Sequence, residues 1–164
     1  MKDNLTIEEK LVALLRNKKM TVTTAESCTG GMISATLVNV PGASWVLNEA
    51  YVTYSNEAKM RLLGVSKATL DTVGAVSEET AYQMAQGAAK AANADCAISV
   101  TGIAGPDGGM PDKPVGTVYA GFYVQGDITV VRYQFDGDRF TVREKTVQSV
   151  LEKLYSYIEN ICSS

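Results

Sequence analysis

The sequence predicts a layered α/β fold: a single domain in which helices pack on the faces of a mixed β-sheet. Segments with helical periodicity alternate with short β-branched segments in the first part of the chain. Two strand-like segments then follow each other directly, as in a β-hairpin. The length of 164 residues suits one domain, because a chain of this size buries enough surface to support its own core.

Capping signals and apolar periodicity define the elements of the first half. Thr6 and Glu9 have the spacing of a capping box, and apolar residues at helical spacing follow them. Pro41-Gly42 is typical of a helix end. The expected elements are a helix over about 6–18, a short strand over 21–25, a helix over 32–40, a strand over 45–54, and a helix capped by Ser55 that runs through Leu63.

The second half combines two helices with three strands. Residues 66–72 are expected to form a short connecting segment. Ser77 is expected to begin the clearest helix, whose small-residue face suits close packing on a sheet. The remaining expected elements are a buried strand over 96–100, a glycine-rich loop over 101–109, a hairpin of strands 115–124 and 128–135 joined by 125–127, and a final helix over about 140–162.

The composition argues against several classes of protein. With 15 basic and 18 acidic residues, the net charge is -3, so no overall positive field attracts nucleic acid or an anionic membrane. No apolar run approaches the ~20 residues of a membrane span, and the acidic N-terminus does not resemble a secretory signal. Three scattered cysteines argue against a disulfide framework, so we expect a cytoplasmic protein.

The chain contains no histidine. This excludes Ser-His-Asp and Cys-His catalysis, and the cysteine spacing does not resemble a zinc site. No metal site and no cofactor are therefore expected. In an enzyme of this composition, lysine, tyrosine, a carboxylate or water must carry the protons.

The first candidate site is the turn that follows strand 21–25, with the sequence Glu26-Ser27-Cys28-Thr29-Gly30-Gly31. A hydroxyl at a strand-to-helix turn lies near free backbone N–H groups and the positive end of a helix, which stabilise an oxyanion. We therefore expect Ser27 to be a nucleophile. Two alternatives stay open: Ser27 or Thr29 only caps the helix, or Cys28 is the nucleophile.

Tyr54 and Lys59 are the candidates for activating a hydroxyl nucleophile. Tyr54 closes an expected strand, and Lys59 lies in the first turn of the next expected helix. A cation at a helix N-terminus opposes the macrodipole, and shielding from water lowers its pKa further. The sequence does not decide which of the two accepts the first proton. The alternative is a solvated lysine and a tyrosine that fills a core edge.

Two further segments suit an anionic or nucleotide ligand. The loop that starts with Thr101 and Gly102 is rich in glycine, so its amides can wrap an anion or a ribose, although it matches neither the Walker nor the Rossmann pattern. Arg139 and Arg143 are four residues apart and project from one helix face, as two phosphate ligands would. A structural turn and surface ion pairs are the alternatives.

Together these segments resemble the nicotinamide-nucleotide amidase domain, which also forms the C-terminal part of the competence-damage-inducible protein CinA. The resemblance covers nearly the whole chain. It rests on five ordered motifs, namely 25–31, Tyr51-Val52-Thr53-Tyr54-Ser55-Asn56 with Lys59 and residues 62–65, Gly74-Ala75-Val76-Ser77, Thr101-Gly102-Ile103-Ala104-Gly105-Pro106, and Gly137-Asp138-Arg139.

The resemblance implies an amidohydrolase that converts nicotinamide mononucleotide to nicotinic acid mononucleotide and ammonia. Ser27 matches the nucleophile, and Tyr54 and Lys59 match the residues that activate it. The amides of Gly30 and Gly31 are expected to hold the oxyanion. Thr101 with Gly102, and an arginine of the Arg139 and Arg143 pair, are expected to bind the substrate.

The resemblance has limits and further implications. The longer CinA proteins carry an N-terminal pyrophosphatase domain for which 164 residues leave no room, so the stand-alone form is expected. Family members are homo-oligomers, often dimers, and the same is expected here. The alternative function is a non-catalytic module of the same fold that binds a nucleotide or a partner protein.

Overall fold

The computed structural model describes residues 4–161. Its elements are α1 (Ile7–Lys18), β1 (Val22–Glu26), α2 (Met32–Val38), the 3-10 helix η1 (Ala43–Trp45), β2 (Tyr51–Val52), α3 (Asn56–Leu63), α4 (Lys67–Thr72), α5 (Glu78–Ala92), β3 (Cys96–Gly102), β4 (Thr117–Val124), β5 (Asp127–Gln134) and α6 (Arg139–Ile161).

The five strands form one mixed sheet in the order β2-β1-β3-β4-β5. β1 runs parallel to both β2 and β3, whereas β4 is antiparallel to β3 and to β5. The predicted mixed sheet is confirmed. Because β2, β1 and β3 are parallel, their carboxyl ends meet at one edge of the sheet, which is where open α/β sheets bind ligands.

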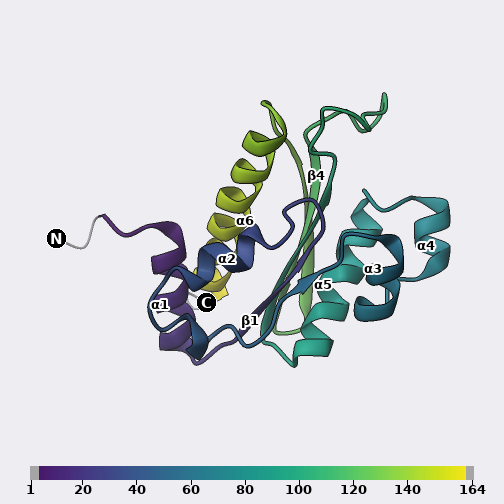
Figure 1. Ribbon diagram of the computed structural model, residues 1–164. Helices are drawn as coiled ribbons and strands as arrows, with labels where there is room; N and C mark the ends of the chain where they lie inside the picture. Colours follow the sequence, from purple (N-terminus) through teal and green to yellow (C-terminus); the bar gives the residue numbers. More distant parts are fainter. Residues whose placement is uncertain (1–3, 162–164) are drawn as a thin grey trace.

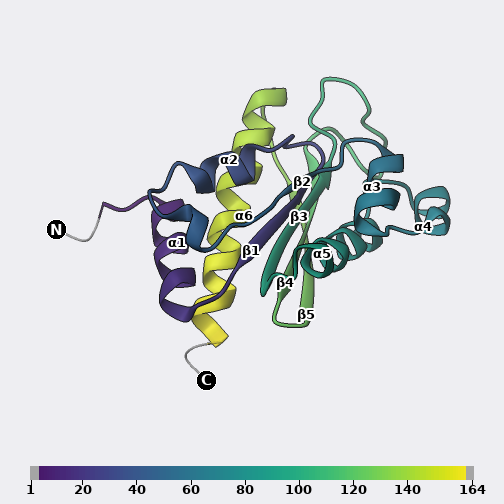
Figure 2. The ribbon, with the colours of Figure 1, turned by 60° about the horizontal axis from the view of Figure 1, so that its bottom comes forward.

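Helices cover both faces of the sheet (Figures 1 and 2). α1, α2 and α6 lie on one side, and α5 lies on the other with α3 and α4 outside it. One buried cluster joins residues such as Leu11 and Leu151 to Ile98 of the sheet, and a second joins Met84 of α5 to Leu63 of α3. Each face of the sheet therefore has its own apolar core, and the predicted layered fold is confirmed.

The small-residue face of α5 packs against the sheet, as predicted. Ala81, Met84, Ala85 and Ala88 of this face are fully buried. Gly87 lies on another side of the helix, where a Cβ atom would come within 1.7 Å of the Leu63 carbonyl oxygen. Small side chains on two sides of α5 thus let both the sheet and α3 approach it closely.

The predicted strand over 45–54 is wrong except at Tyr51–Val52. The segment starts in the 3-10 helix Ala43–Trp45 after Gly42, which has a φ of 88°. Gly42 turns the chain, and the side chain of Trp45 faces solvent while Val46 is buried. β2 pairs only with Ala25 and Glu26 and is an edge strand. The alternating pattern of the sequence therefore reflects an irregular surface segment.

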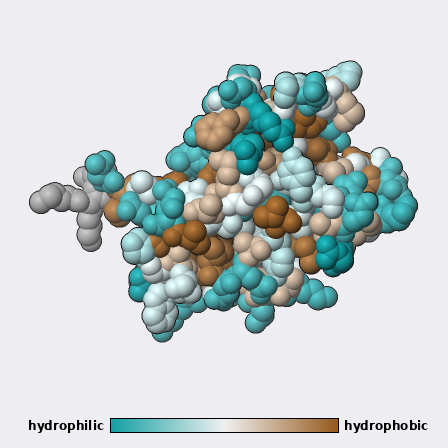
Figure 3. Space-filling model, in the orientation of Figure 1, coloured by the Kyte–Doolittle hydropathy of each residue, from teal (hydrophilic) through white to brown (hydrophobic). Residues whose placement is uncertain are grey.

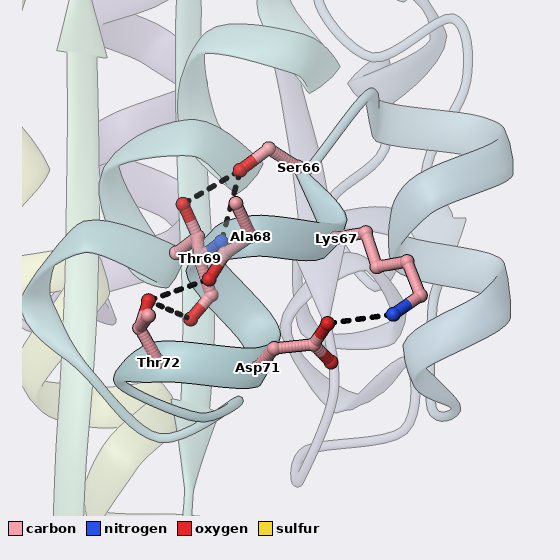
Figure 4. Close-up of polar contacts among 6 residues, drawn as sticks. All are labelled: Ser66, Lys67, Ala68, Thr69, Asp71 and Thr72. Atoms are coloured by element: carbon pink, nitrogen blue, oxygen red, sulfur yellow. Dashed lines mark hydrogen bonds and ion pairs between the residues drawn. The ribbon is translucent and has the colours of Figure 1, made fainter.

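The connecting segment predicted over 66–72 is instead a short helix, α4 (Figure 4). The Ser66 hydroxyl caps it by accepting a hydrogen bond from the Thr69 N–H at 3.1 Å. Lys67 and Asp71 form an ion pair at 2.6 Å, one turn apart. Six residues with one cap give too weak a periodic signal to separate this helix from a turn.

The other boundaries agree with the sequence to within a few residues. The capping box of Thr6 and Glu9 is present, and β4 and β5 are joined by Gln125 and Gly126, both with positive φ. That two-residue turn is shorter than the three residues predicted, and its positive φ angles match the twist of a hairpin. The predicted last residue of the final helix, Cys162, lies outside the described residues.

On the molecular surface, apolar residues are scattered among polar ones. Figure 3 shows brown hydrophobic patches separated by teal and white residues on the face seen in Figure 1. None of the helices within residues 4–161 has the length and apolar character needed to cross a membrane.

Candidate active site

A cavity of about 270 Å³ lies at the carboxyl ends of the parallel strands. It collects side chains from the turn after β1, the start of α3, the segment before α5, the loop after β3 and the start of α6. Its lining residues are Ser27, Cys28, Tyr54, Asn56, Lys59, Ala75, Val76, Thr101, Gly102, Ile103, Ala104, Gly105, Asp107 and Arg139. Six of the residues predicted from the sequence to form the site therefore meet here.

Lys59 and Ser27 are in direct contact. The Lys59 Nζ donates to the Ser27 Oγ at 3.0 Å, to the carbonyl oxygen of Thr53 at 2.8 Å and to that of Tyr54 at 3.3 Å. These contacts point the amine at the serine hydroxyl. α3 places Lys59 there because the Ser55 side chain caps the helix, which fixes its first turn.

The surroundings of Lys59 favour the neutral amine. Its side chain is 1% exposed, and this burial lowers the pKa of Lys59 from its ordinary value. All three of its acceptors are uncharged oxygens, so no carboxylate contact restores the cation. A neutral amine can use its two N–H groups for the carbonyl oxygens of Thr53 and Tyr54, which leaves its lone pair for the Ser27 hydroxyl 3.0 Å away. In that state the amine is placed to accept the serine proton.

The turn that carries Ser27 is held from both sides. The carboxylate of Glu26, fully buried, accepts hydrogen bonds from the Thr29 hydroxyl at 2.7 Å and from the Ile33 N–H at 2.8 Å. Arg143 donates to the carbonyl oxygens of Cys28 at 2.9 Å and Thr29 at 3.1 Å. Ser27 is therefore fixed at the end of β1 by its neighbours.

Arg139 and Tyr54 form a bridge at the cavity. The Arg139 guanidinium donates to the Tyr54 hydroxyl at 2.9 Å and to the Gly105 carbonyl oxygen at 2.7 Å. The Tyr54 side chain is 61% exposed. Lys59 contacts Tyr54 only through its backbone carbonyl oxygen, so the phenol is tied to Arg139 and the amine to Ser27.

Cys28 does not fit the role of nucleophile. Its side chain is 6% exposed, and desolvation raises the pKa of the thiol to about 11. A thiol with that pKa carries almost no thiolate at neutral pH. The geometry therefore favours Ser27 over Cys28.

Thr101 and Gly102 line the cavity from the end of β3. The Thr101 hydroxyl donates to the Ala75 carbonyl oxygen at 2.7 Å, which joins β3 to the segment before α5. A Cβ atom at Gly102 would come within 2.8 Å of the Thr117 carbonyl oxygen. Gly102 is thus needed for the approach of β4, in addition to its place at the cavity.

Gly30, Gly31 and Arg143 are predicted site residues that do not line the cavity. The Gly30 N–H already donates to the Ser27 carbonyl oxygen at 3.0 Å, so the prediction that it holds an oxyanion is corrected. Gly31, with a φ of 103°, starts α2. Both glycines shape the turn, and Arg143 binds its carbonyl groups.

The sequence reasoning missed three residues of the site. Asn56 and Asp107 line the cavity, but a polar residue at a helix start or in a glycine-rich loop gives no specific signal. Glu26 has a weak signal: the following helix starts after a glycine that has no capping side chain, so its free N–H groups favour a nearby carboxylate. Among residues 4–161, no three acidic or cysteine side chains are grouped to hold a metal ion.

The chain is similar to known proteins over almost its full length. The family model described as the CinA C-terminal domain matches residues 4–158. A relative from Clostridium perfringens is 55% identical over 157 residues, covering 96% of this chain and 38% of the relative. A CinA-like protein from Kosmotoga olearia is 52% identical over 89% of this chain. The chain thus spans less than half the length of these relatives.

Solved structures of similar length share the fold. A CinA superfamily protein from Klebsiella pneumoniae has a TM-score of 0.91 at 34% identity, covering 94% of this chain and 96% of that one. A competence/damage inducible protein from Agrobacterium tumefaciens has a TM-score of 0.88 at 41% identity, covering 93% and 98%.

Proposed function

Because the chain belongs to the family of CinA C-terminal domains, we propose that it hydrolyses the carboxamide of nicotinamide mononucleotide with Ser27 as nucleophile. The observation that carries this proposal is the 3.0 Å contact between the Lys59 Nζ and the Ser27 Oγ. In a chain without histidine, that contact supplies the nucleophile and base that acyl transfer needs.

In the proposed reaction, Lys59 carries the proton through both halves. The neutral amine takes the proton of the Ser27 hydroxyl while the oxygen attacks the carboxamide carbon. The resulting ammonium then gives the proton to the departing nitrogen, which leaves as ammonia, and Ser27 keeps the nicotinoyl group as an ester. Lys59 next takes a proton from water, which attacks the ester, and returns it to Ser27 as the acid product leaves.

The backbone N–H of Cys28 is the proposed donor to the oxyanion. Cys28 lines the cavity next to Ser27, and within residues 4–161 its N–H contacts its own sulfur but no oxygen. The N–H of the residue after the nucleophile serves this purpose in other serine hydrolases. This assignment replaces the amides of Gly30 and Gly31.

Charge supports a ligand that carries a pyridinium ring and a phosphate. Arg139 contacts only uncharged oxygens in its two hydrogen bonds, so its cation can still attract the phosphate. Burial lowers the pKa of Lys59 and so favours a neutral amine, which does not repel a positively charged ring. Asp107, which also lines the cavity, adds a negative charge at its side.

Ammonia release from nicotinamide mononucleotide, followed with a coupled assay, tests the proposal. Wild-type protein is expected to release ammonia, and Ser27→Ala is expected to lose turnover while it still binds the nucleotide. Ser156→Ala, an exposed serine in α6, is the matched control and should keep full activity.

Two outcomes would overturn the proposal. A Ser27→Ala variant with normal turnover would exclude the serine mechanism. Nucleotide binding by the wild type without any ammonia release would favour the non-catalytic module instead. A panel of amides with and without a ribose phosphate would then show whether another amide is the substrate.

A further inference from the structure

The Ser27 turn lies between two buried or half-buried charges of opposite sign, Glu26 and Arg143. The Glu26 carboxylate accepts four hydrogen bonds. Its donors are the Thr29 hydroxyl at 2.7 Å, the Ile33 N–H at 2.8 Å, the Thr24 hydroxyl at 3.1 Å and the Ser34 N–H at 3.1 Å. Two of these are backbone groups in the first turn of α2, whose own N-cap, Gly31, has no side chain to offer.

Arg143 binds the opposite polar groups of the same turn. Its Nε donates to the Cys28 carbonyl oxygen at 2.9 Å, and its Nη2 donates to the Thr29 carbonyl oxygen at 3.1 Å. Its Nη2 also lies close above Gly30, at 3.6 Å from where a Cβ would stand. The guanidinium thus spans the turn between the nucleophile and α2.

These contacts determine where the N–H groups of the turn point. In a trans peptide the C=O and the following N–H point in opposite directions. The Ser27 carbonyl oxygen accepts from the Gly30 N–H, so the Cys28 N–H points away from Gly30. The Cys28 carbonyl oxygen, which belongs to the next peptide plane, is held by Arg143. The two peptide planes that flank Cys28 are therefore each held by a hydrogen bond, one to Gly30 and one to Arg143.

We propose that Glu26 and Arg143 are positioning residues that clamp the Ser27 turn, keeping the serine hydroxyl on Lys59 and the Cys28 N–H available to the oxyanion. This inference rests on the proposed function, because it concerns the same nucleophile. It assigns the two arginines of α6 different tasks: Arg139, in the cavity, binds the substrate phosphate, and Arg143, outside the cavity, acts on the enzyme's own backbone.

A pair of substrates separates these two tasks. The measurements are kcat and KM for nicotinamide mononucleotide and for nicotinamide riboside, which lacks the phosphate. Arg143→Ala and Glu26→Gln are expected to lower kcat about 10- to 100-fold for both substrates with little change in KM, because misplaced catalytic groups act on the chemical step. Arg139→Ala is expected to raise KM for the nucleotide alone.

Matched controls guard against simple loss of folding. Lys145→Ala removes a surface cation of the same helix that also donates to a backbone carbonyl, that of Asp136, and should leave both constants unchanged. Millimolar guanidinium should restore part of the kcat of Arg143→Ala, which a misfolded protein would not allow. An Arg143→Ala variant that raises KM for the nucleotide only would overturn the inference.

A chemical probe distinguishes failure of the clamp from failure of the proposed function. Phenylmethylsulfonyl fluoride labels an activated serine. The mass of the intact protein, measured over time, gives the rate at which Ser27 is labelled. If the wild type is labelled but releases no ammonia, the choice of substrate is wrong, and a labelling rate at least 10-fold lower in Arg143→Ala and Glu26→Gln would still support the clamp. Equal labelling rates in these variants would overturn it.

Discussion

Replacing Glu26 with glutamine should destabilise the fold by an amount that follows from its contacts. Each oxygen of the buried carboxylate accepts two hydrogen bonds. Glutamine keeps one oxygen, which can still accept from Thr29 and Ile33, but its NH2 group then faces Thr24 and Ser34. The Thr24 hydroxyl can rotate and accept, whereas the Ser34 N–H is left without an acceptor.

Two contributions make up the expected decrease in the free energy of unfolding of Glu26→Gln. An unsatisfied N–H costs about 1–3 kcal/mol, and loss of the negative charge at the start of α2 costs roughly 1 kcal/mol more. The expected decrease in the free energy of unfolding is thus about 2–4 kcal/mol. For a domain of this size, that corresponds to a Tm lower by about 4–16 °C.

Thermal unfolding followed by circular dichroism measures this difference. Glu78→Gln is the matched control, because Glu78 is also in the first turn of a helix, α5, but is exposed. Glu78→Gln should lower the free energy of unfolding by less than about 1 kcal/mol and the Tm by less than roughly 4 °C. If Glu26→Gln lowers the Tm no more than Glu78→Gln does, the description of Glu26 as the cap of α2 is wrong.

Three further predictions concern the cavity and the helix behind it. Cys28→Ala should keep the rate of ammonia release within about threefold of the wild type, because a thiol whose pKa is raised to about 11 carries almost no thiolate at neutral pH. A much larger loss of rate in the coupled assay would contradict the assignment of Ser27 as the nucleophile. Tyr54→Phe should raise KM through Arg139 but lower kcat far less than Lys59→Met in steady-state kinetics, and equal losses of kcat would make the phenol a proton carrier. Gly87→Ala should lower the Tm by about 6–12 °C, the effect of roughly 3 kcal/mol of overpacking, because its Cβ would meet the Leu63 carbonyl oxygen; an unchanged melting curve would contradict that contact.

The layered fold was predictable because its longer elements carry strong local signals. The capping box of Thr6 and the small-residue face of α5 each predicted a helix that the structure contains. The failures lie where tertiary contacts decide. β2 has only two residues and exists because β1 pairs with it, and α4 depends on the Ser66 cap and on Gln83 of α5, whose amide reaches Thr69.

The candidate site was predictable in its residues but less so in their tasks. Motifs identified Ser27 and Lys59, and the structure brings their side chains together. Spacing could not separate Arg139 from Arg143, because side chains four residues apart share a helix face. In the structure Arg139 meets Tyr54 and Gly105 at the cavity, whereas Arg143 meets the backbone of the turn after β1, and both contacts join segments far apart in the sequence. The expected homo-oligomer stays a prediction.

The pH dependence of kcat/KM for nicotinamide mononucleotide, in the wild type and in Lys59→Met, tests the central claim most directly. Burial lowers the pKa of Lys59, and only the neutral amine accepts a proton, so activity should rise with pH and level off before the ordinary lysine value of about 10.4. Lys59→Met should be about 10²- to 10⁴-fold less active and should lack this rise. A variant whose profile has the same height and shape as that of the wild type would show that Lys59 does not activate Ser27.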